Sequence, residues 1–290
     1  MKACYQKIQS GARNYIRSDI ESFFTLIPKP TIVSTIRKIV ADEEFLKLFE
    51  SAITTELANL ADLGKEKEAF PIYDIGVAQG SCLSPLLGNI LLSEFDREMN
   101  VGDISCYRYI DDFIILAPTE RAANAAFKRG LKLLNSHGLT AYDPKTNNDK
   151  AELGKTSGMF TFLGCDIRPG MIRPNKKSKR RLIDNIDQVF GESIALMRDP
   201  VNLIAAHRTV AETLSDVSNI LQGWGNQYSF CNDAIFMRQI DETVDKKIAT
   251  YLSKYSNRKD EFEKSGQPEN TRRLLGVHLL CDSKKAPIVV

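Results

Sequence analysis

The stretch "RYIDDFIIL", Arg108 to Leu116, places two acidic residues, Asp111 and Asp112, inside the most strand-like segment of the chain. Adjacent carboxylates repel each other and resist burial, so this segment folds only where something accommodates both charges. A hairpin turn would do so, because Asp is a common turn residue and β-branched residues flank the pair. A divalent metal ion would do so too, because it takes oxygen ligands. From these residues alone, both interpretations stay open.

The bulk properties predict a soluble globular protein. At 290 residues, 43% of them hydrophobic, the chain can form one large domain or two smaller ones. A formal net charge of +2 gives no global argument for a polyanionic partner, so the local charge distribution has to decide. The six cysteines occur singly, without CxxC spacing, which indicates reduced structural thiols. With no signal-peptide pattern and no bilayer-length apolar run, we expect a cytoplasmic protein without membrane contact.

Hydrophobic spacing predicts two different architectures along the chain. The expected elements are a strand from Arg13, helices at 31–63 and after Pro85, a strand-turn-strand at Ser105–Ala117, a helix at 121–136 and a hairpin at 159–174 turning at Pro169–Gly170. From about Lys176 the pattern is helical almost to the end. We therefore predict an α+β domain at residues 1–174 and an all-helical region at 175–290, with a polar loop near 256–270.

Three features carry candidate chemistry. Asp19 stands at the end of an apolar strand, Gly76–Asn89 forms a Gly- and Ser-rich loop entering a helix, and the Asp111–Asp112 pair follows. Each has an ordinary structural interpretation, as a helix cap, a connector and a turn.

Taken together and in this order, the three features resemble the polymerase palm of reverse transcriptases. The matching segments are "SDIESFF", "AQGSCLSPLLGNILL" and "YRYIDDF". Further along, "GLTAYDPKT" resembles the next motif of that family, and "FTFLGCDI" resembles its primer-grip hairpin. "IRPNKKSKRRL" and "LQGWGNQYSFCNDAIFMRQIDETVDKKIATYL" are similar to the thumb, or maturase region, of group II intron-type bacterial enzymes. Retron and defence-associated reverse transcriptases share the palm motifs, so the subfamily stays open.

The resemblance implies a right-hand palm that performs RNA-directed DNA synthesis with two Mg²⁺ ions. Two such ions would activate a primer 3′-hydroxyl and hold the triphosphate of the incoming deoxynucleotide. The implied catalytic residues are Asp19, Asp111 and Asp112. Asp19 and Asp111 would bridge the metals, Asp112 would support them more weakly, and the backbone carbonyl of Ile20 would add a ligand.

The resemblance also implies a nucleotide-binding set of Phe24, Gln79, Gly80 and Lys145. Phe24 would exclude the ribose 2′-hydroxyl, with a core phenylalanine as the alternative. Gln79 and Gly80 match the loop beneath the template base, where a missing side chain permits close approach. Lys145 would stand near the pyrophosphate, and its rivals are a solvated surface lysine at that position and Lys155 in the catalytic role.

Nucleic-acid contacts are expected around a basic run. Seven Lys or Arg residues and no acid lie between Arg168 and Arg181, and such clusters bind phosphate backbones without reading sequence. A solvated loop is the alternative. The implied contact residues are Tyr109, Leu163, Gly164, Arg173, Lys176, Lys177, Lys179, Arg180 and Arg181.

One feature departs from the family. Reverse transcriptases of this type carry a fingers region before the first catalytic Asp, whereas Asp19 lies close to Met1. The expectations are a truncated gene, an enzyme completed by a fingers-containing partner chain, or a palm kept for binding. The first function is thus polymerisation with an RNA template, a DNA or RNA primer and deoxynucleotide triphosphates. The alternative is a catalytically silent or split RNA-binding subunit of maturase type.

Overall fold

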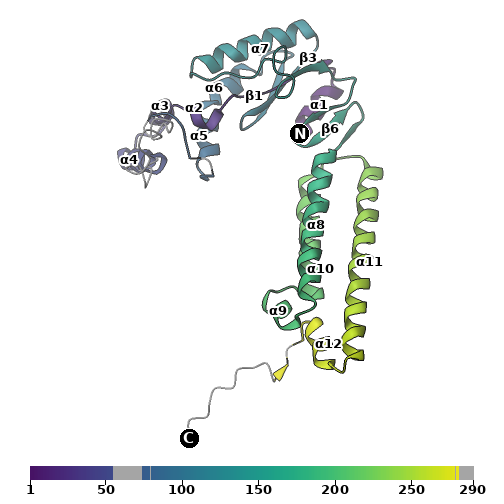
Figure 1. Ribbon diagram of the computed structural model, residues 1–290. Helices are drawn as coiled ribbons and strands as arrows, with labels where there is room; N and C mark the ends of the chain where they lie inside the picture. The colour runs from purple at the N-terminus through teal and green to yellow at the C-terminus, as the bar shows by residue number, and fades with distance from the viewer. Residues whose placement is uncertain (55–73, 79, 278, 281–290) are drawn as a thin grey trace. The chain divides into compact units, whose positions relative to one another are not determined.

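The chain divides into two compact units. A computed structural model describes residues 1–54, 74–78, 80–277 and 279–280. One unit comprises Met1–Leu163 with Arg168–Gly170, and the other comprises Gly164–Ile167 with Met171–Val290 (Figure 1). The expected site residue Gln79 lies outside the described residues.

An antiparallel sheet forms the centre of the first unit. Within the described residues its order is β2-β3-β1-β4, with β1 at Asn14–Asp19, β2 at Ser105–Tyr109, β3 at Asp112–Ala117 and β4 at Glu152–Lys155. Strand β3 is buried along nearly its whole length, as its run of Phe, Ile and Leu requires. The sheet therefore grows around β1 and β3, the two strands that carry the acidic residues at their ends.

The described helices of the first unit are α1 (Lys2–Gln9), α2 (Phe23–Leu26), α3 (Lys29–Arg37), α4 (Glu43–Ile53), α5 (Ser84–Leu91), α6 (Ser93–Glu98) and α7 (Glu120–Asn135). Of these, α1, α6 and α7 pack against the sheet, whereas α3 packs against α4 and α5. Phe113 of β3 packs edge-on against Phe95 of α6 at 5.7 Å between ring centroids, and it stacks with Phe127 of α7 at 6.4 Å. These three rings join the sheet to both helices.

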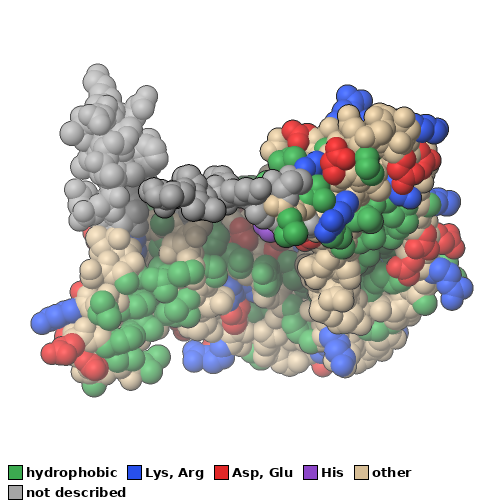
Figure 2. Space-filling model, turned by 90° about the horizontal axis from the view of Figure 1, so that it is seen from below, with side chains coloured by type: hydrophobic (Ala, Val, Ile, Leu, Met, Phe, Trp, Pro, Cys, Tyr) green, Lys and Arg blue, Asp and Glu red, His purple; other side chains and the backbone are tan. Residues whose placement is uncertain are grey.

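Two predictions about helices in this unit need correction. The helix expected at 31–63 is divided into α3 and α4 within the described residues, and Asp42 caps α4 by accepting from two backbone N–H groups. The helix expected after Pro85 is interrupted at Leu92, which is fully buried and separates α5 from α6. Figure 2 shows exposed hydrophobic side chains gathered near α3 and α4, where Ile39 and Leu48 are exposed.

The predicted hairpin is present and belongs to a larger sheet. Strands β5 (Phe160–Phe162), β6 (Cys165–Arg168) and β7 (Met171–Pro174) lie in the order β5-β6-β7. Gly170 has a φ of +79°, so the Pro169–Gly170 turn between β6 and β7 uses the conformational freedom of glycine.

The second unit is mainly helical. Its helices are α8 (Lys176–Leu196), α9 (Pro200–Ala205), α10 (Val210–Gln227), α11 (Ala234–Lys264) and α12 (Pro268–Leu274). The polar loop expected near 256–270 is wrong, because α11 continues to Lys264. Pairs one helical turn apart, such as Lys259–Glu263 at 3.4 Å, support the helix there, and Phe262 packs against the core. None of the described helices has the length and apolarity needed to cross a membrane.

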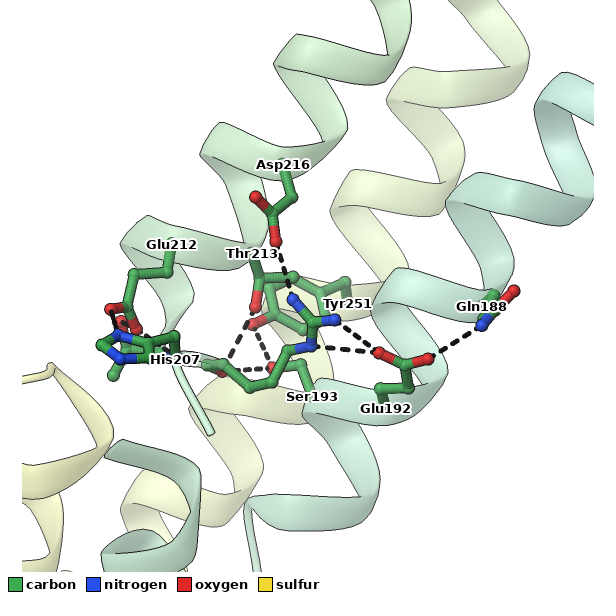
Figure 3. A network of polar contacts seen from close by, with 10 residues as sticks. Gln188, Glu192, Ser193, His207, Glu212, Thr213, Asp216 and Tyr251 are labelled. Atoms are coloured by element: carbon green, nitrogen blue, oxygen red, sulfur yellow. Dashed lines mark hydrogen bonds and ion pairs between the residues drawn. The ribbon is translucent and has the colours of Figure 1, made fainter. Parts of the chain in front are cut away.

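A polar network joins the helices of the second unit (Figure 3). Arg208 pairs with Glu192 of α8 and Asp216 of α10, each at 2.7 Å. The buried Ser193 hydroxyl donates to the Arg208 carbonyl at 2.8 Å and lies 2.9 Å from the Tyr251 hydroxyl of α11. The half-exposed ion pairs contribute little by themselves, whereas the buried hydroxyl satisfies groups from two other segments.

We expect Ser193→Ala to lower the free energy of unfolding of the second unit by about 1–3 kcal/mol, because it leaves the Tyr251 hydroxyl without its buried partner and removes one of the two hydroxyl donors to the Arg208 carbonyl, the other being Thr213. Urea titrations followed by the fluorescence of Trp224 measure this, since the chain's single tryptophan packs against the core of that unit. Ser253→Ala, at an exposed position of α11, is the matched control. Equal midpoints for the two variants would contradict the prediction.

Candidate active site

Strand pairing brings the predicted acidic residues together. Asp19 is the last residue of β1 and stands opposite Asp112, the first residue of β3, in the antiparallel register. One position further, the Ile20 N–H donates to the Asp111 carbonyl at 3.1 Å. Three carboxylates therefore converge on one end of the central strands.

The acidic pair lies at a hairpin, as one of the two sequence interpretations predicted. Tyr109 pairs with Asp112, which leaves Ile110 and Asp111 as the turn between β2 and β3. Ile110 has a φ of +61°, an unfavourable conformation for a β-branched residue. Tyr109 at the end of β2 is 62% exposed, so its ring is accessible to a ligand.

The Asp19 carboxylate has one satisfied oxygen and one unsatisfied oxygen. Lys150 Nζ lies 3.4 Å from Asp19 Oδ2, and the Lys150 side chain is 56% exposed. Asp19 Oδ1 is buried without a hydrogen-bond partner. Since buried polar atoms are nearly always paired, this oxygen has an open place for a cation or a donor.

Sequence reasoning missed Lys150. It favoured Lys145, which is exposed and whose backbone N–H donates to Asp143, with Lys155 on the edge strand β4 as the rival. The loop after Tyr142 turns back on itself, with the Ala151 N–H donating to the Asn147 carbonyl at 3.0 Å, and this brings Lys150 to Asp19. Its nitrogen also lies 5.9 Å from the centre of the Tyr142 ring. The loop contains two aspartates as well as two lysines, so its charge did not single out Lys150 in the sequence.

Burial and mutual repulsion raise the pKa values of two of the carboxylates. For Asp19, burial raises the pKa most, the Asp111 charge raises it further, and Lys150 opposes both effects. For Asp112, burial and then the charges of Asp19 and Asp111 raise the pKa, whereas Arg17 and Lys150 lower it. The site therefore holds more negative charge than its own lysine and arginine neutralise.

The donor set fits a divalent cation. Among the described residues there is no ready-made group of three or more His, Cys, Asp or Glu side chains arranged around a metal position. Mg²⁺ is commonly held by one or two carboxylates, water and substrate phosphates, so such a preformed cage is not required. The unpartnered Oδ1 of Asp19 and the raised carboxylate pKa values are features that a bound cation would relieve.

Backbone contacts connect the Gly-rich loop to the helix that carries Phe24. The Val77 N–H donates to the Phe24 carbonyl at 2.8 Å. Phe23 is buried under α5, where a Cβ on Gly88 would lie 2.7 Å from its ring, and Phe24 packs half-buried beside it. Gly80 has a φ of +92° in open space, so glycine is required there for its backbone conformation.

Some of the predicted nucleic-acid-binding residues of the second unit already contact other side chains of the protein. Arg173 contacts Asp166 at 3.6 Å and Asp233 at 3.4 Å, and Lys179 lies 5.5 Å from the Phe236 ring centre. These two side chains help to hold the unit together. The others in the helical part of the run are exposed: Lys176, Lys177, Arg180 and Arg181.

The residues between β5 and β6 are conformationally special. Leu163 has a φ of +45° and Gly164 a φ of +76°. A Cβ on Gly164 would lie 3.0 Å from Ser178 Oγ and 3.1 Å from the Tyr228 hydroxyl, which themselves form a 2.9 Å hydrogen bond. The rings of Trp224 and Tyr228 lie tilted against each other with their centroids 4.6 Å apart, and Trp224 packs against the core. Gly164 thus lets the chain approach α8 and α10 closely.

Comparison with known proteins identifies the family. The sequence model described as "Reverse transcriptase (RNA-dependent DNA polymerase)" matches residues 2–167, which is more than half of the chain. The protein therefore belongs to the reverse transcriptase family. This confirms the expected fold class, an α+β polymerase palm followed by an α-helical thumb-like region.

Several individual proteins are similar to parts of the chain. Protein YkfC of Escherichia coli (strain K12) is 24% identical over 221 residues, which cover 64% of this chain and 54% of YkfC. The retrovirus-related Pol polyprotein from type-1 retrotransposable element R2 of Popillia japonica is 24% identical over 57% of this chain and 30% of its own length. The chain thus spans about half of the first relative and less of the second.

Among solved structures, apo telomerase from Candida tropicalis aligns over 95% of this chain and 49% of its own, with 15% identity and a TM-score of 0.44. A likeness this distant carries no argument about function.

We expect Asp112→Asn to raise the free energy of unfolding of the metal-free first unit at pH 8. Because the pKa of Asp112 is raised on folding, the folded protein binds this proton more tightly than the unfolded chain does. The stability that this proton contributes is lost as the pH rises from the pKa of the unfolded chain, about 3.9, through the higher pKa of the folded protein. The advantage of the variant should therefore shrink as the pH is lowered.

Native-state hydrogen exchange of the β1 and β3 amides, in EDTA across this pH range, measures the difference. Asp103→Asn, in an exposed loop before β2, is the matched control and should match the wild type at every pH. An advantage of Asp112→Asn that does not change with pH would contradict the electrostatic explanation.

Proposed function

We propose that this chain is an RNA-directed DNA polymerase that adds deoxynucleotides to the 3′-hydroxyl of a DNA or RNA primer on an RNA template. The observation that carries the proposal is the strand register that sets Asp19 opposite Asp112 beside the Asp111 turn. A binding module has no need for three converging carboxylates, two of which, Asp19 and Asp112, have pKa values raised by burial and by neighbouring negative charge. Membership of the reverse transcriptase family supports the same activity.

Asp19 and Asp111 are proposed to bridge two Mg²⁺ ions, with Asp112 in a weaker supporting role and the Ile20 carbonyl as a further ligand. When bound, the ions would activate the attacking 3′-oxygen and neutralise the charge that develops on the triphosphate. Asp19 is suited to this role by its free Oδ1. Asp111 is suited by its place at the tip of the hairpin.

Residues of the loop and of α2 are proposed to shape the nucleotide site. Phe24 would exclude a ribose 2′-hydroxyl by its volume. The hydrogen bond from the Val77 N–H to the Phe24 carbonyl would hold Phe24 beside the loop that includes Gln79 and Gly80. Lys150 adds a cation that reaches Asp19 and is exposed enough to move toward a departing pyrophosphate. A role for Lys145 near the pyrophosphate stays a prediction.

Exposed lysines at the start of α8 are proposed to contact the nucleic-acid backbone. Lys176 and Lys177 occupy its first turn, which contains no acidic residue. Cations are unfavourable at a helix N-terminus, where the macrodipole is positive, so this arrangement costs the helix stability. A bound phosphate would interact favourably with both the lysines and the helix end. Nucleic-acid contacts by Tyr109, Leu163, Gly164 and the remaining basic residues stay predictions.

We expect primer extension on an RNA template with deoxynucleotides and Mg²⁺, and we expect Asp111→Ala to reduce its rate at least about 1,000-fold. A metal ligand supplies several kcal/mol of transition-state stabilisation, and each 1.36 kcal/mol is tenfold in rate. Asp103→Ala is the control and should extend the primer like the wild type. An absence of extension by the wild type, with RNA binding unaffected by Asp111→Ala, would favour the split or RNA-binding subunit instead.

We expect Lys176→Gln together with Lys177→Gln to weaken RNA binding and to make it less dependent on salt. Each lost phosphate contact reduces the slope of log K against log salt by about 0.7–0.9. Fluorescence anisotropy of a labelled RNA at several salt concentrations measures the slope. Lys246→Gln with Lys254→Gln removes the same charge from exposed positions of α11. Identical slopes for the two double variants would contradict a specific role of the α8 lysines.

A further inference from the structure

The hairpin that presents Asp111 holds a strained residue. Ile110 is the first of the two turn residues and has a positive φ, whereas Asp111 is not among the described residues with positive φ. This pattern is that of a type II′ turn, in which glycine is strongly preferred at the first position. A β-branched residue there costs on the order of 1–3 kcal/mol and persists only where neighbouring groups enforce it. The enforcing group has to act on the backbone of Ile110.

Arg108 supplies that enforcement from the adjacent strand. Its Nη1 donates to the Ile110 carbonyl at 2.8 Å and to Asn89 Oδ1 of α5 at 3.2 Å. Its Nε donates to Asp96 Oδ1 of α6 at 2.8 Å, and Nη2 pairs with the other oxygen of the same carboxylate. The Arg108 side chain is 5% exposed, whereas the Asp96 side chain is 43% exposed, so the guanidinium is shielded from water and its carboxylate partner is partly open to it.

The planar guanidinium group explains how one arginine side chain can bind a carboxylate and the turn carbonyl at the same time. Asp96 binds it in a bidentate manner, which fixes both its position and the orientation of its plane. With the plane fixed, the remaining N–H groups point in set directions, one of them at the carbonyl of the peptide that joins Ile110 to Asp111. The orientation of that peptide determines where the Asp111 side chain is placed.

We propose that Arg108 is a positioning residue for Asp111, which holds the strained turn by anchoring the Ile110 carbonyl to α5 and α6. The part of this inference that concerns metal binding rests on the proposed function, whereas the conformational part does not. A lysine cannot replace the arginine, because an ammonium lacks the rigid fork that engages Asp96 and the turn together. The competing explanation is that Arg108 only ties β2 to α6 through an ion pair.

Arg108→Lys separates these explanations through the Ile20 amide. Ile20 is buried and its N–H donates to the Asp111 carbonyl, so its hydrogen exchange reports on the turn without requiring activity. We expect the Ile20 amide of Arg108→Lys to exchange at least about tenfold faster, which corresponds to about 1.4 kcal/mol of local opening. The amides of Ile16 and Ile115, in the middle of the sheet, should be unchanged. Arg97→Lys, an exposed arginine on α6, is the matched control.

A second variant tests the strain itself. Glycine adopts a positive φ without support, so Ile110→Gly should remove the need for Arg108. We expect Arg108→Lys to lower the affinity for Mn²⁺, measured by electron paramagnetic resonance. Adding Ile110→Gly to it should restore most of that affinity. The proposal is overturned if Arg108→Lys leaves the hydrogen exchange of the Ile20 amide unchanged. It is also overturned if Arg108→Lys speeds exchange throughout the unit and adding Ile110→Gly does not reverse this. A wild-type protein that binds no Mn²⁺ would instead refute the proposed metal chemistry, and the Ile20 exchange would still decide the role of Arg108.

Discussion

The antiparallel pairing of β1 with β3 is the constraint on which the candidate site depends. It runs from Asn14 opposite Ala117 to Asp19 opposite Asp112. Side chains alternate across a sheet, so a slip of one residue would move the buried residues of β3 to the opposite face. Such a slip would also separate Asp19 from Asp112. The hydrophobic residues that hold the register therefore place the carboxylates as well. The same register is required for core packing and for the geometry of the site.

The same region concentrates features that oppose folding. The pKa values of Asp19 and Asp112 are raised because both carboxyl groups are partly buried and lie near other negative charges. Two of the four described non-glycine residues with positive φ, Ser22 and Ile110, lie within three residues of these carboxylates. Unfavourable conformations and charges are retained where surrounding structure enforces them, and they cluster at functional sites. The packed rings of Phe95, Phe113 and Phe127 hold β3, the strand that begins at Asp112, against α6 and α7.

Local pattern predicted the parts of the fold whose signals are local. Strand β1, the Asp111 turn and helix α7 follow from alternation, turn residues and helical spacing. Lys150 and Arg108 were not predicted to be important, because their partners, Asp19 and Asp96, are brought to them only by the tertiary fold. The polar stretch after Ser256 was mistaken for a loop because charged residues spaced one turn apart also stabilise an exposed helix.

Two cations beside the candidate site, Arg108 at the Ile110–Asp111 turn and Lys150 at Asp19, differ in how freely they can move. Arg108 is buried and its guanidinium is occupied by Asp96, so it contributes orientation and little free charge. Lys150 approaches Asp19 more closely than a water-separated pair would, yet most of its side chain is exposed. An exposed ammonium gains little from such a pair and loses little on leaving it. Lys150 can therefore shield the metal-free site and give up its place to a divalent cation, which a buried arginine in that position could not do.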